Sequence, residues 1–358
     1  MLSRLHIYVF FALISFLITG CAVVQQQKKS PLINAVKSND LATVETLIAD
    51  GADLNAKGST YDWGKTALIE AAIRGNMEIT KKLLLAGANV NGVDDYGDTA
   101  LMAAAEFGHA NVSKLLIEYG ADVDATKPDM TTALMIAARK GELEVVKILL
   151  KANADVNIGF GSGDTALSLA ALKGNISIME ALIEKGAYVN QYDTKGCSLL
   201  ERHIRNFSII KLLINSGADV NEKLTSGMTP LMFAAYYGDN DLTNLLIAHG
   251  ADVNIKCNSS DKFLDKSTPL HWAAIKGHNE TVILLLKENP DIDAQTRYGN
   301  TALIHAAMNG YAIIVDTLLK SGADIAIKNS DEATALMLAD EGNHKDVVKL
   351  LKEAGVVK

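Results

Sequence analysis

A repeat of 33 residues extends along most of this chain and restricts its possible folds more than any other feature. Thr-Ala-Leu or Thr-Pro-Leu begins at residues 66, 99, 132, 165, 229, 268, 301 and 334, and weaker versions begin at Ser30 and Ser198. A second marker, Gly-Ala-Asp-Val-Asn or a near variant, recurs with the same period. Two markers that share one period indicate stacked structural repeats, each of which packs mainly on its neighbours.

Each repeat is predicted to hold two short helices and a hairpin. In the repeat that begins at Thr99, this residue is suited to cap a helix, because its hydroxyl can accept a hydrogen bond from a free N–H. Leu101 and Ala105 follow at helical spacing, and Gly108 ends that helix. A second apolar stripe follows, which Gly120 ends as a left-handed cap. The two helices of one repeat cannot bury their apolar faces alone, so the repeats must stack on one another.

The stretch Thr268-Pro269-Leu270-His271-Trp272-Ala273-Ala274, followed by Gly277-His278, carries the clearest family signal. With the 33-residue period, it resembles the ankyrin-repeat family. The resemblance implies an all-α solenoid of about ten helix–turn–helix repeats with hairpin loops, which occupies residues 30–358. It also implies a function in protein binding, through the hairpin tips and the exposed positions of the first helix of each repeat.

The first 20 residues have the pattern of a targeting segment. Arg4 precedes an apolar stretch from Leu5 to Ile18, which is too short for a membrane-spanning helix. Ile18-Thr19-Gly20-Cys21 resembles the bacterial lipobox, which implies a signal peptide over residues 1–20, a lipidated Cys21 and a polar linker over residues 21–29. Ala22 after the cysteine resembles the pattern that sends lipoproteins to the outer membrane. The alternative is a plain secretory signal or signal anchor in which Cys21 has no role.

Composition and charge exclude two classes of protein. Hydrophobic residues make up 49% of the chain and charged residues 21%, which argues against intrinsic disorder. There are 34 basic and 42 acidic residues, a net charge of −8, and proteins that bind nucleic acid usually have a basic excess. We therefore expect no nucleic-acid partner.

Motifs for catalysis, cofactors or metals are weak. Gly159-Phe160-Gly161-Ser162-Gly163 lies in a hairpin of normal length, not between a buried strand and a helix as a phosphate-binding loop requires. The histidines at 109, 278 and 344 lie between the paired helices, where they can bond the turn. Cys197 and Cys257 lie two repeats apart, so we expect two free thiols. No catalytic residue, cofactor, metal or small-molecule substrate is predicted, and an enzyme is the most distant alternative.

Candidate partner-binding residues lie before each Thr marker and after each Ala-Ala pair. Interfaces favour Trp, Tyr and Arg, and six of the chain's 20 aromatic residues occupy such positions. Trp63, Tyr96 and Phe107 fall in adjacent repeats and should share one surface, although Phe107 and Tyr236 could instead fill gaps between repeats. The predicted set is Trp63, Arg74, Tyr96, Glu106, Phe107, Arg139, Tyr236, Tyr237, Arg297 and Tyr298.

Three places break the period. Extra residues lie in the hairpins around Tyr61–Trp63 and Asn258–Phe263, and the repeat at Ser198 is two residues short, for which we expect a local kink. The resulting interpretation is a monomeric lipoprotein of the bacterial envelope, facing the periplasm or the exterior. It would bind an unidentified protein, to inhibit, protect or scaffold an envelope enzyme. The alternative is a surface or secreted factor that engages a host or prey protein.

Overall fold

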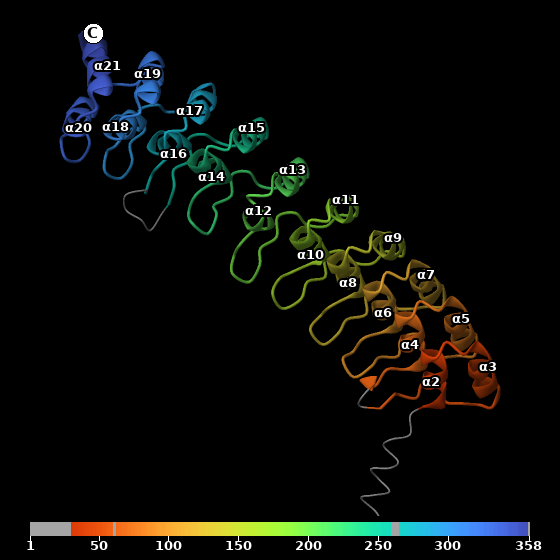
Figure 1. The fold of residues 1–358 in the computed structure, drawn as a ribbon. Coiled ribbons are helices and arrows are strands. Elements are labelled where there is room, and N and C mark those ends of the chain that lie inside the picture. Colours follow the sequence, from red (N-terminus) through yellow and green to blue (C-terminus); the bar gives the residue numbers. More distant parts are fainter. Residues whose placement is uncertain (1–29, 60–61, 259–264, 357–358) are drawn as a thin grey trace, which may run out of the picture. The chain divides into compact units, whose positions relative to one another are not determined.

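The protein is described here by a computed structural model, which covers residues 30–59, 62–258 and 265–356. Within these ranges the chain forms 20 α-helices and no strands, so the predicted all-α repeat architecture is confirmed (Figure 1). The predicted signal peptide, Cys21 and the linker lie outside the described residues. The chain divides into two compact units, unit 1 (Met1–Tyr188) and unit 2 (Val189–Lys358).

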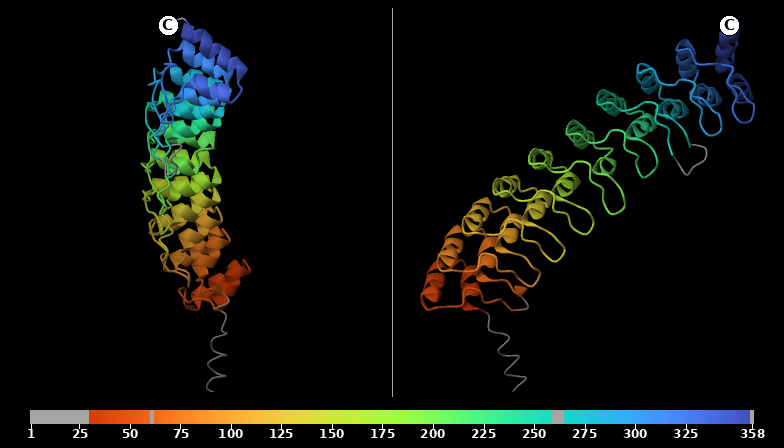
Figure 2. Two further views of the ribbon diagram at one scale, coloured as in Figure 1. Left: turned by 90° about the vertical axis from the view of Figure 1, so that its left-hand side faces the viewer. Right: turned by 180° about the vertical axis from the view of Figure 1, so that it is seen from behind.

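Unit 1 contains five pairs of helices, each joined by a short turn. The first helices of the pairs stack on one another in one layer and the second helices in another, and the hairpins project beyond the first layer (Figures 1 and 2). The pairs are α2 (Pro31–Lys37) with α3 (Leu41–Ala49), α4 (Ala67–Ile73) with α5 (Met77–Leu85), α6 (Ala100–Glu106) with α7 (Ala110–Glu118), α8 (Ala133–Lys140) with α9 (Leu143–Lys151), and α10 (Ala166–Lys173) with α11 (Ile176–Glu184).

Unit 2 repeats this arrangement, with one irregular helix at its start. Helix α12 has only four residues, whereas the corresponding helices α14 and α16 have eight each. The pairs are α12 (Leu199–Arg202) with α13 (Phe207–Asn215), α14 (Pro230–Tyr237) with α15 (Asn240–Ala248), α16 (Pro269–Lys276) with α17 (Asn279–Leu286), α18 (Ala302–Met308) with α19 (Ala312–Lys320), and α20 (Ala335–Glu341) with α21 (Lys345–Val356).

The threonine markers cap the first helices as predicted. The Thr99 hydroxyl accepts a hydrogen bond from the backbone N–H of Met102 at 3.2 Å, which satisfies a donor that the helix leaves free at its start. The Ala-Ala pairs that follow are buried; Ala104 and Ala105, for example, have no exposed surface. Small side chains at these positions let the first helices of neighbouring repeats approach closely, which explains why the packing needs few bulky residues. The same cap occurs at Thr66, Thr132, Thr165, Thr229, Thr301 and Thr334.

A ladder of side-chain amides and carboxylates joins successive repeats. The Asn91 side chain accepts a hydrogen bond from the backbone N–H of Asp122 in the next repeat at 2.8 Å. In unit 2 the Asn221 side chain accepts from the N–H of Asp252 at 2.8 Å, and its amide donates to the Gly250 carbonyl at 3.1 Å. The last residue of the Gly-Ala-Asp-Val-Asn marker therefore satisfies backbone groups of the following repeat. Other steps are Asn55 to Asn89, Asp124 to Asp155, Asn157 to Tyr188, Asn190 to Asp219, Asn254 to Asp291 and Asp293 to Asp324.

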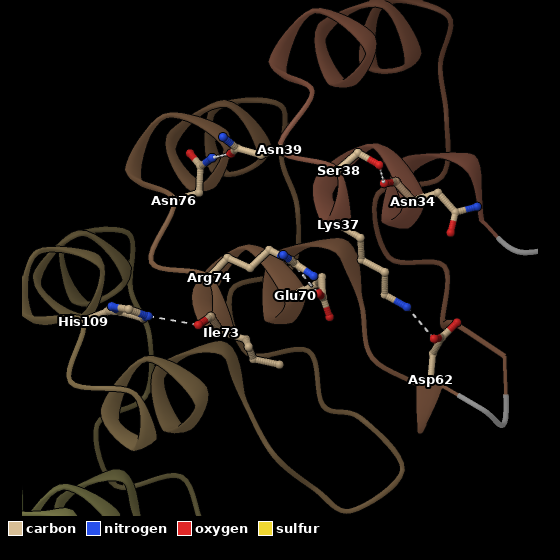
Figure 3. Close-up of polar contacts among 10 residues, drawn as sticks. All are labelled: Asn34, Lys37, Ser38, Asn39, Asp62, Glu70, Ile73, Arg74, Asn76 and His109. Carbon is tan, nitrogen blue, oxygen red and sulfur yellow. Dashed lines mark hydrogen bonds and ion pairs between the residues drawn. The ribbon is translucent and has the colours of Figure 1, made fainter.

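The histidines between paired helices form hydrogen bonds with carbonyls of the preceding repeat, whereas the sequence predicted only bonds to the turn. His109 Nε2 donates to the Ile73 carbonyl at 2.9 Å, a carbonyl at the end of α4 (Figure 3). His278 and His344 make the same bond to the Tyr236 and Met308 carbonyls at 3.1 and 3.0 Å. Helix ends leave carbonyls without partners, and these rings supply the missing donors. The three histidines are therefore structural.

The short helix α12 should be the least protected part of the interior repeats. It has fewer helical hydrogen bonds than its counterparts, and Arg205, Asn206 and Phe207 after it are exposed. Local opening needs less free energy where few buried contacts and few hydrogen bonds must break. We expect amide hydrogen exchange to be fastest around residues 201–207 among repeats five to seven. Uniform protection across those repeats, measured by mass spectrometry, would contradict this expectation.

Candidate binding surface

Three aromatic side chains of unit 1 lie together on its surface, as the sequence predicted. The ring centroids of Trp63 and Tyr96 are 5.3 Å apart, and the two planes are tilted by 43°. Phe107, at the end of α6, lines the same depression and stacks on His109 at 6.4 Å. Trp63, Tyr96 and Phe107 are 52%, 51% and 52% exposed. Phe107 therefore does not fill a gap between repeats, and about half of each side chain is free to contact another molecule.

Backbone contacts between neighbouring hairpins hold Trp63 beside Tyr96. The N–H of Asp95 donates to the Trp63 carbonyl at 3.0 Å. Trp63 and Gly64 both have positive φ, 57° and 65°, and a Cβ at Gly64 would collide with the Asp95 carboxylate. A bulky residue with positive φ is strained, and here the chain holds a tryptophan in that conformation at the hairpin tip. Glycine is needed next to it because of the close approach of Asp95.

A buried carboxylate fixes the conformation of the hairpin that carries Tyr96. Asp94 is buried, and one of its oxygens accepts from the N–H groups of Tyr96 and Asp98 at 2.8 and 2.9 Å. The backbone N–H of Asp94 donates in turn to the Asp98 carbonyl at 3.1 Å. Hydrogen bonds thus fix the hairpin backbone on both sides of Tyr96. Because the backbone is fixed, the aromatic side chain loses less conformational freedom when a partner binds.

The depression between these residues, here called the aromatic groove, has a volume of about 230 Å³. Ile69 and Ile73 of α4 and Ala103 of α6 contribute apolar surface to its lining. Pockets for drug-sized ligands usually measure about 300–1,000 Å³. The aromatic groove is smaller than that and open, which suits one or two apolar side chains of a protein partner better than a metabolite.

Ion pairs surround the aromatic groove. Asp98 pairs with Lys127 at 2.9 Å, and Glu106 pairs with Lys140 at 3.0 Å. Burial raises the pKa of the Asp98 carboxyl, and the ion pair with Lys127 opposes that shift. Lys65 adds a cationic side chain to the lining. An apolar centre with a polar, solvent-accessible rim is the usual anatomy of a protein interface.

Two predicted residues of unit 1 lie outside the groove lining. Arg74 forms an ion pair at 2.8 Å with Glu70, one turn earlier on α4 (Figure 3). Arg139 lies at the exposed end of α8, one repeat further along. The structure therefore brings together Trp63, Tyr96, Glu106 and Phe107, whereas neither arginine lines the groove. Nearby, Lys37 and Asp62 form an ion pair that fixes the start of the Trp63 turn (Figure 3).

The predicted residues of unit 2 form two separate groups. Tyr236 packs on Trp272 with centroids 5.4 Å apart, so it partly fills the gap between α14 and α16, and Tyr237 is half exposed. Arg297 pairs with Asp265 at 3.3 Å in a hairpin, and the Tyr298 carbonyl accepts from the N–H of Ser330 at 2.9 Å.

Lys65 and Asp98 stand directly before a Thr marker, as the predicted pattern requires, and both line the aromatic groove. Other residues of the surface were missed from the sequence. Phe233 and Arg205, which surround Tyr237 in unit 2, carry no such signal. Their exposure follows from the length of α12, which the sequence does not show directly.

The described residues give no sign of a catalytic or metal centre. No cluster of three or more His, Cys, Asp or Glu side chains within them could hold a metal ion. Cys197 and Cys257 are free thiols, and burial raises the pKa of Cys257. Gly159 bridges Thr165 across a hairpin that precedes α10, which is not the setting of a phosphate-binding loop. No helix in the described part of the chain is long and apolar enough to cross a membrane.

Comparisons with known proteins give local similarities. Mitochondrial disaggregase from Homo sapiens is 41% identical over 64 residues, which are 18% of this chain and 9% of that protein. Mitochondrial disaggregase from Bos taurus is 35% identical over 82 residues, which are 23% of this chain and 12% of that protein. The chain thus covers about a tenth of the length of these relatives, so the likeness concerns a short segment of each.

The family comparison covers most of the chain. The sequence model of ankyrin repeats, which describes three copies, matches residues 32–127, 121–193, 202–257 and 255–329. Ankyrin repeats form protein–protein interaction domains, and the family is in general a non-catalytic repeat scaffold. Helix pairs, capped by threonine and packed through alanine, agree with this match along both units. The chain belongs to the ankyrin-repeat family.

Proposed function

We propose that this protein binds a partner protein of the bacterial envelope through the aromatic groove, while a lipid on Cys21 tethers it to the membrane. One observation carries the binding part: three half-exposed aromatic side chains converge on one apolar depression, and the backbone around two of them is fixed by hydrogen bonds. Exposed aromatic side chains in a preorganised setting are the usual anchors of interfaces.

The partner would insert one or two apolar side chains between Trp63 and Phe107. Its polar groups would meet the ion pairs of Asp98 with Lys127 and Glu106 with Lys140 at the rim. The expected role is to inhibit, protect or scaffold an envelope enzyme, with no chemistry of its own. Co-purification from detergent extracts of the native cell tests this: an envelope enzyme on the beads supports the proposal. Recovery of no protein by wild-type bait, after chemical cross-linking in the cells, would contradict it.

The envelope location rests on the Ile18-Thr19-Gly20-Cys21 sequence. Replacing Cys21 with alanine removes the sulfur that would carry the lipid. The Cys21→Ala protein should therefore be found in the soluble fraction or remain uncleaved. Its mass and its membrane fractionation measure this, with Cys197→Ala as the control that should behave like wild type. Normal mass and membrane fractionation of Cys21→Ala would contradict the lipoprotein part of the proposal and leave the binding part standing.

A further inference from the structure

Unit 2 contains a depression beside its irregular repeat. Helix α12 ends at Arg202 after four residues, and the chain passes through a short turn into α13. The side of α14 that faces this turn is therefore less covered than in the other repeats. Phe233 shows the effect, because it is partly exposed, whereas Ile136 and Trp272, at the same position of their own repeats, are 4% and 3% exposed.

The depression, here called the notch, has a volume of about 380 Å³. This is within the usual range for ligand pockets, about 300–1,000 Å³. Its walls come from the α12 turn, the hairpin before α14, and α14 itself. Most of the side chains that line it are apolar or aromatic. The principal apolar lining residues are Ile204, Leu224, Met228, Phe233, Tyr236 and Tyr237.

Two cations lie over the aromatic wall of the notch. The Arg205 guanidinium is 5.0 Å from the ring centroid of Tyr237 and donates to its hydroxyl at 2.8 Å. The Lys276 ammonium is 4.3 Å from the ring centroid of Tyr236. Both cationic residues are exposed. Contact with an aromatic face restrains each cation near the rim, and each keeps its charge available to a ligand.

Two acidic residues lie close to these cations, and one of them, Glu201, lines the notch. The Glu201 carboxylate accepts hydrogen bonds from Thr225, including one from its backbone N–H at 3.0 Å. Glu222 is buried and accepts a hydrogen bond from the Ser198 hydroxyl; burial raises the pKa of its carboxyl, and that hydrogen bond opposes the shift. Helix α14 carries no charged residue. The notch thus has an aromatic wall with two cations at its rim and one carboxylate, Glu201, in its lining, on a chain whose net charge is −8.

From the apolar volume and the cationic rim together, we infer that the notch binds a peptide segment of a partner that carries a large apolar side chain beside acidic residues. The apolar side chain fills the space that the missing turn of α12 leaves open, against Phe233. The flanking carboxylates meet Arg205 and Lys276. The notch shares no residue with the aromatic groove, so this second site is independent of the proposed function.

A displayed library of random twelve-residue peptides tests the inference on the full chain. Peptides are selected on wild-type protein and then compared on Ile204→Trp, which fills the notch, and on Arg205→Ala with Lys276→Ala, which removes its cations. We expect a group of peptides with Phe, Leu or Trp next to Asp or Glu, retained at least tenfold less by both variants and released by added salt. The same group should be retained by Trp63→Ala with Phe107→Ala, because that variant alters only the aromatic groove.

Three outcomes would overturn the inference. One is a selection in which no peptide distinguishes wild type from Ile204→Trp. Another is a notch-dependent group that lacks acidic residues or is basic. The third is equal retention when the cations are removed. Thermal unfolding by circular dichroism checks that each variant is folded; if Ile204→Trp is not, Tyr237→Ala, at a half-exposed position, takes its place with the same expected loss.

Discussion

Lowering the pH from 7 to 5 should reduce the free energy of unfolding by about 4 kcal/mol. Two buried histidines cause this loss, about 2 kcal/mol each. His271 and His305 are buried in neighbouring repeats of unit 2, with ring centroids 6.0 Å apart. Burial lowers the pKa of His271 to about 4 and that of His305 to about 3, from the ordinary 6.5. His271 also lowers the pKa of His305, because two protonated rings would repel each other.

The sign of this pH effect follows from the number of protons that the folded and the unfolded protein bind. In the folded protein both rings stay neutral at pH 5, whereas in the unfolded chain they take up protons below about pH 6.5. Above about pH 6.5 the two histidines therefore do not reduce the free energy of unfolding. Below that pH they reduce it progressively, until the pH reaches the pKa values of the folded state. Urea titrations at pH 7 and 5 measure the difference.

Contacts in the structure explain why the two rings stay neutral. His271 Nδ1 accepts from the N–H of Thr268 at 3.1 Å, so Nε2 carries the proton and donates to the Asn300 carbonyl at 3.1 Å. Neither nitrogen of His305 has a hydrogen-bond partner among the described residues. A second proton on either ring would add a buried charge without a counter-ion, which is costly.

His305→Leu separates the contribution of one ring. Leu169 occupies the same position in another repeat and is buried, so leucine fits the packing there. The variant should be more stable than wild type at pH 7 by about 1–3 kcal/mol, because it removes two buried nitrogens without partners. Between pH 7 and 5 it should lose about half as much stability as wild type.

A neighbouring substitution serves as control. Ile304→Val should lower stability by about 0.5–1.5 kcal/mol equally at both pH values, because it removes only a buried methyl group. If His305→Leu kept the full pH dependence of wild type, the account of the buried histidines would be wrong.

Removing two anchors of the aromatic groove should abolish capture of the partner without unfolding the protein. Truncating a central aromatic anchor commonly costs about 2 kcal/mol or more, which is roughly thirtyfold in affinity. Trp63→Ala with Phe107→Ala should therefore weaken binding by at least that factor. Both side chains are about half exposed, so we expect the melting temperature to change by only a few degrees.

A matched control removes exposed apolar surface elsewhere in unit 1. Leu85 and Tyr119, at the ends of second helices, are 63% and 38% exposed, and replacing both with alanine should leave capture unchanged. Unchanged capture by the groove variant would instead place the site elsewhere, with Tyr236, Tyr237 and Tyr298 as the next candidates. A large fall in its melting temperature would show that the two aromatics are core residues.

The repeat architecture could be predicted from the sequence because its determinants are local. Each threonine caps the helix that follows it, and each Ala-Ala pair is buried. These roles depend on spacing along the chain, and the period fixes that spacing. The prediction that Trp63, Tyr96 and Phe107 share one surface was confirmed for the same reason.

Features that depend on which surfaces stay uncovered could not be predicted. Arg74 was predicted to bind a partner, but it pairs with Glu70, four residues earlier in the same repeat, and it does not line the groove. The notch required knowing which face of α14 a four-residue helix leaves uncovered. The sequence identified the repeat at Ser198 as irregular and predicted a kink there, but it did not predict the pocket beside Phe233.

Photo-cross-linking from position 96 shows whether the aromatic groove contacts the partner in the cell. Benzoylphenylalanine replaces Tyr96 in one full-length protein and Tyr119 in another, and both are illuminated in the native cell. We expect a discrete adduct of higher mass from position 96, which disappears when Trp63→Ala and Phe107→Ala are added, and no such adduct from position 119. An adduct from position 119 with none from position 96, or one that persists in the groove variant, would contradict this expectation.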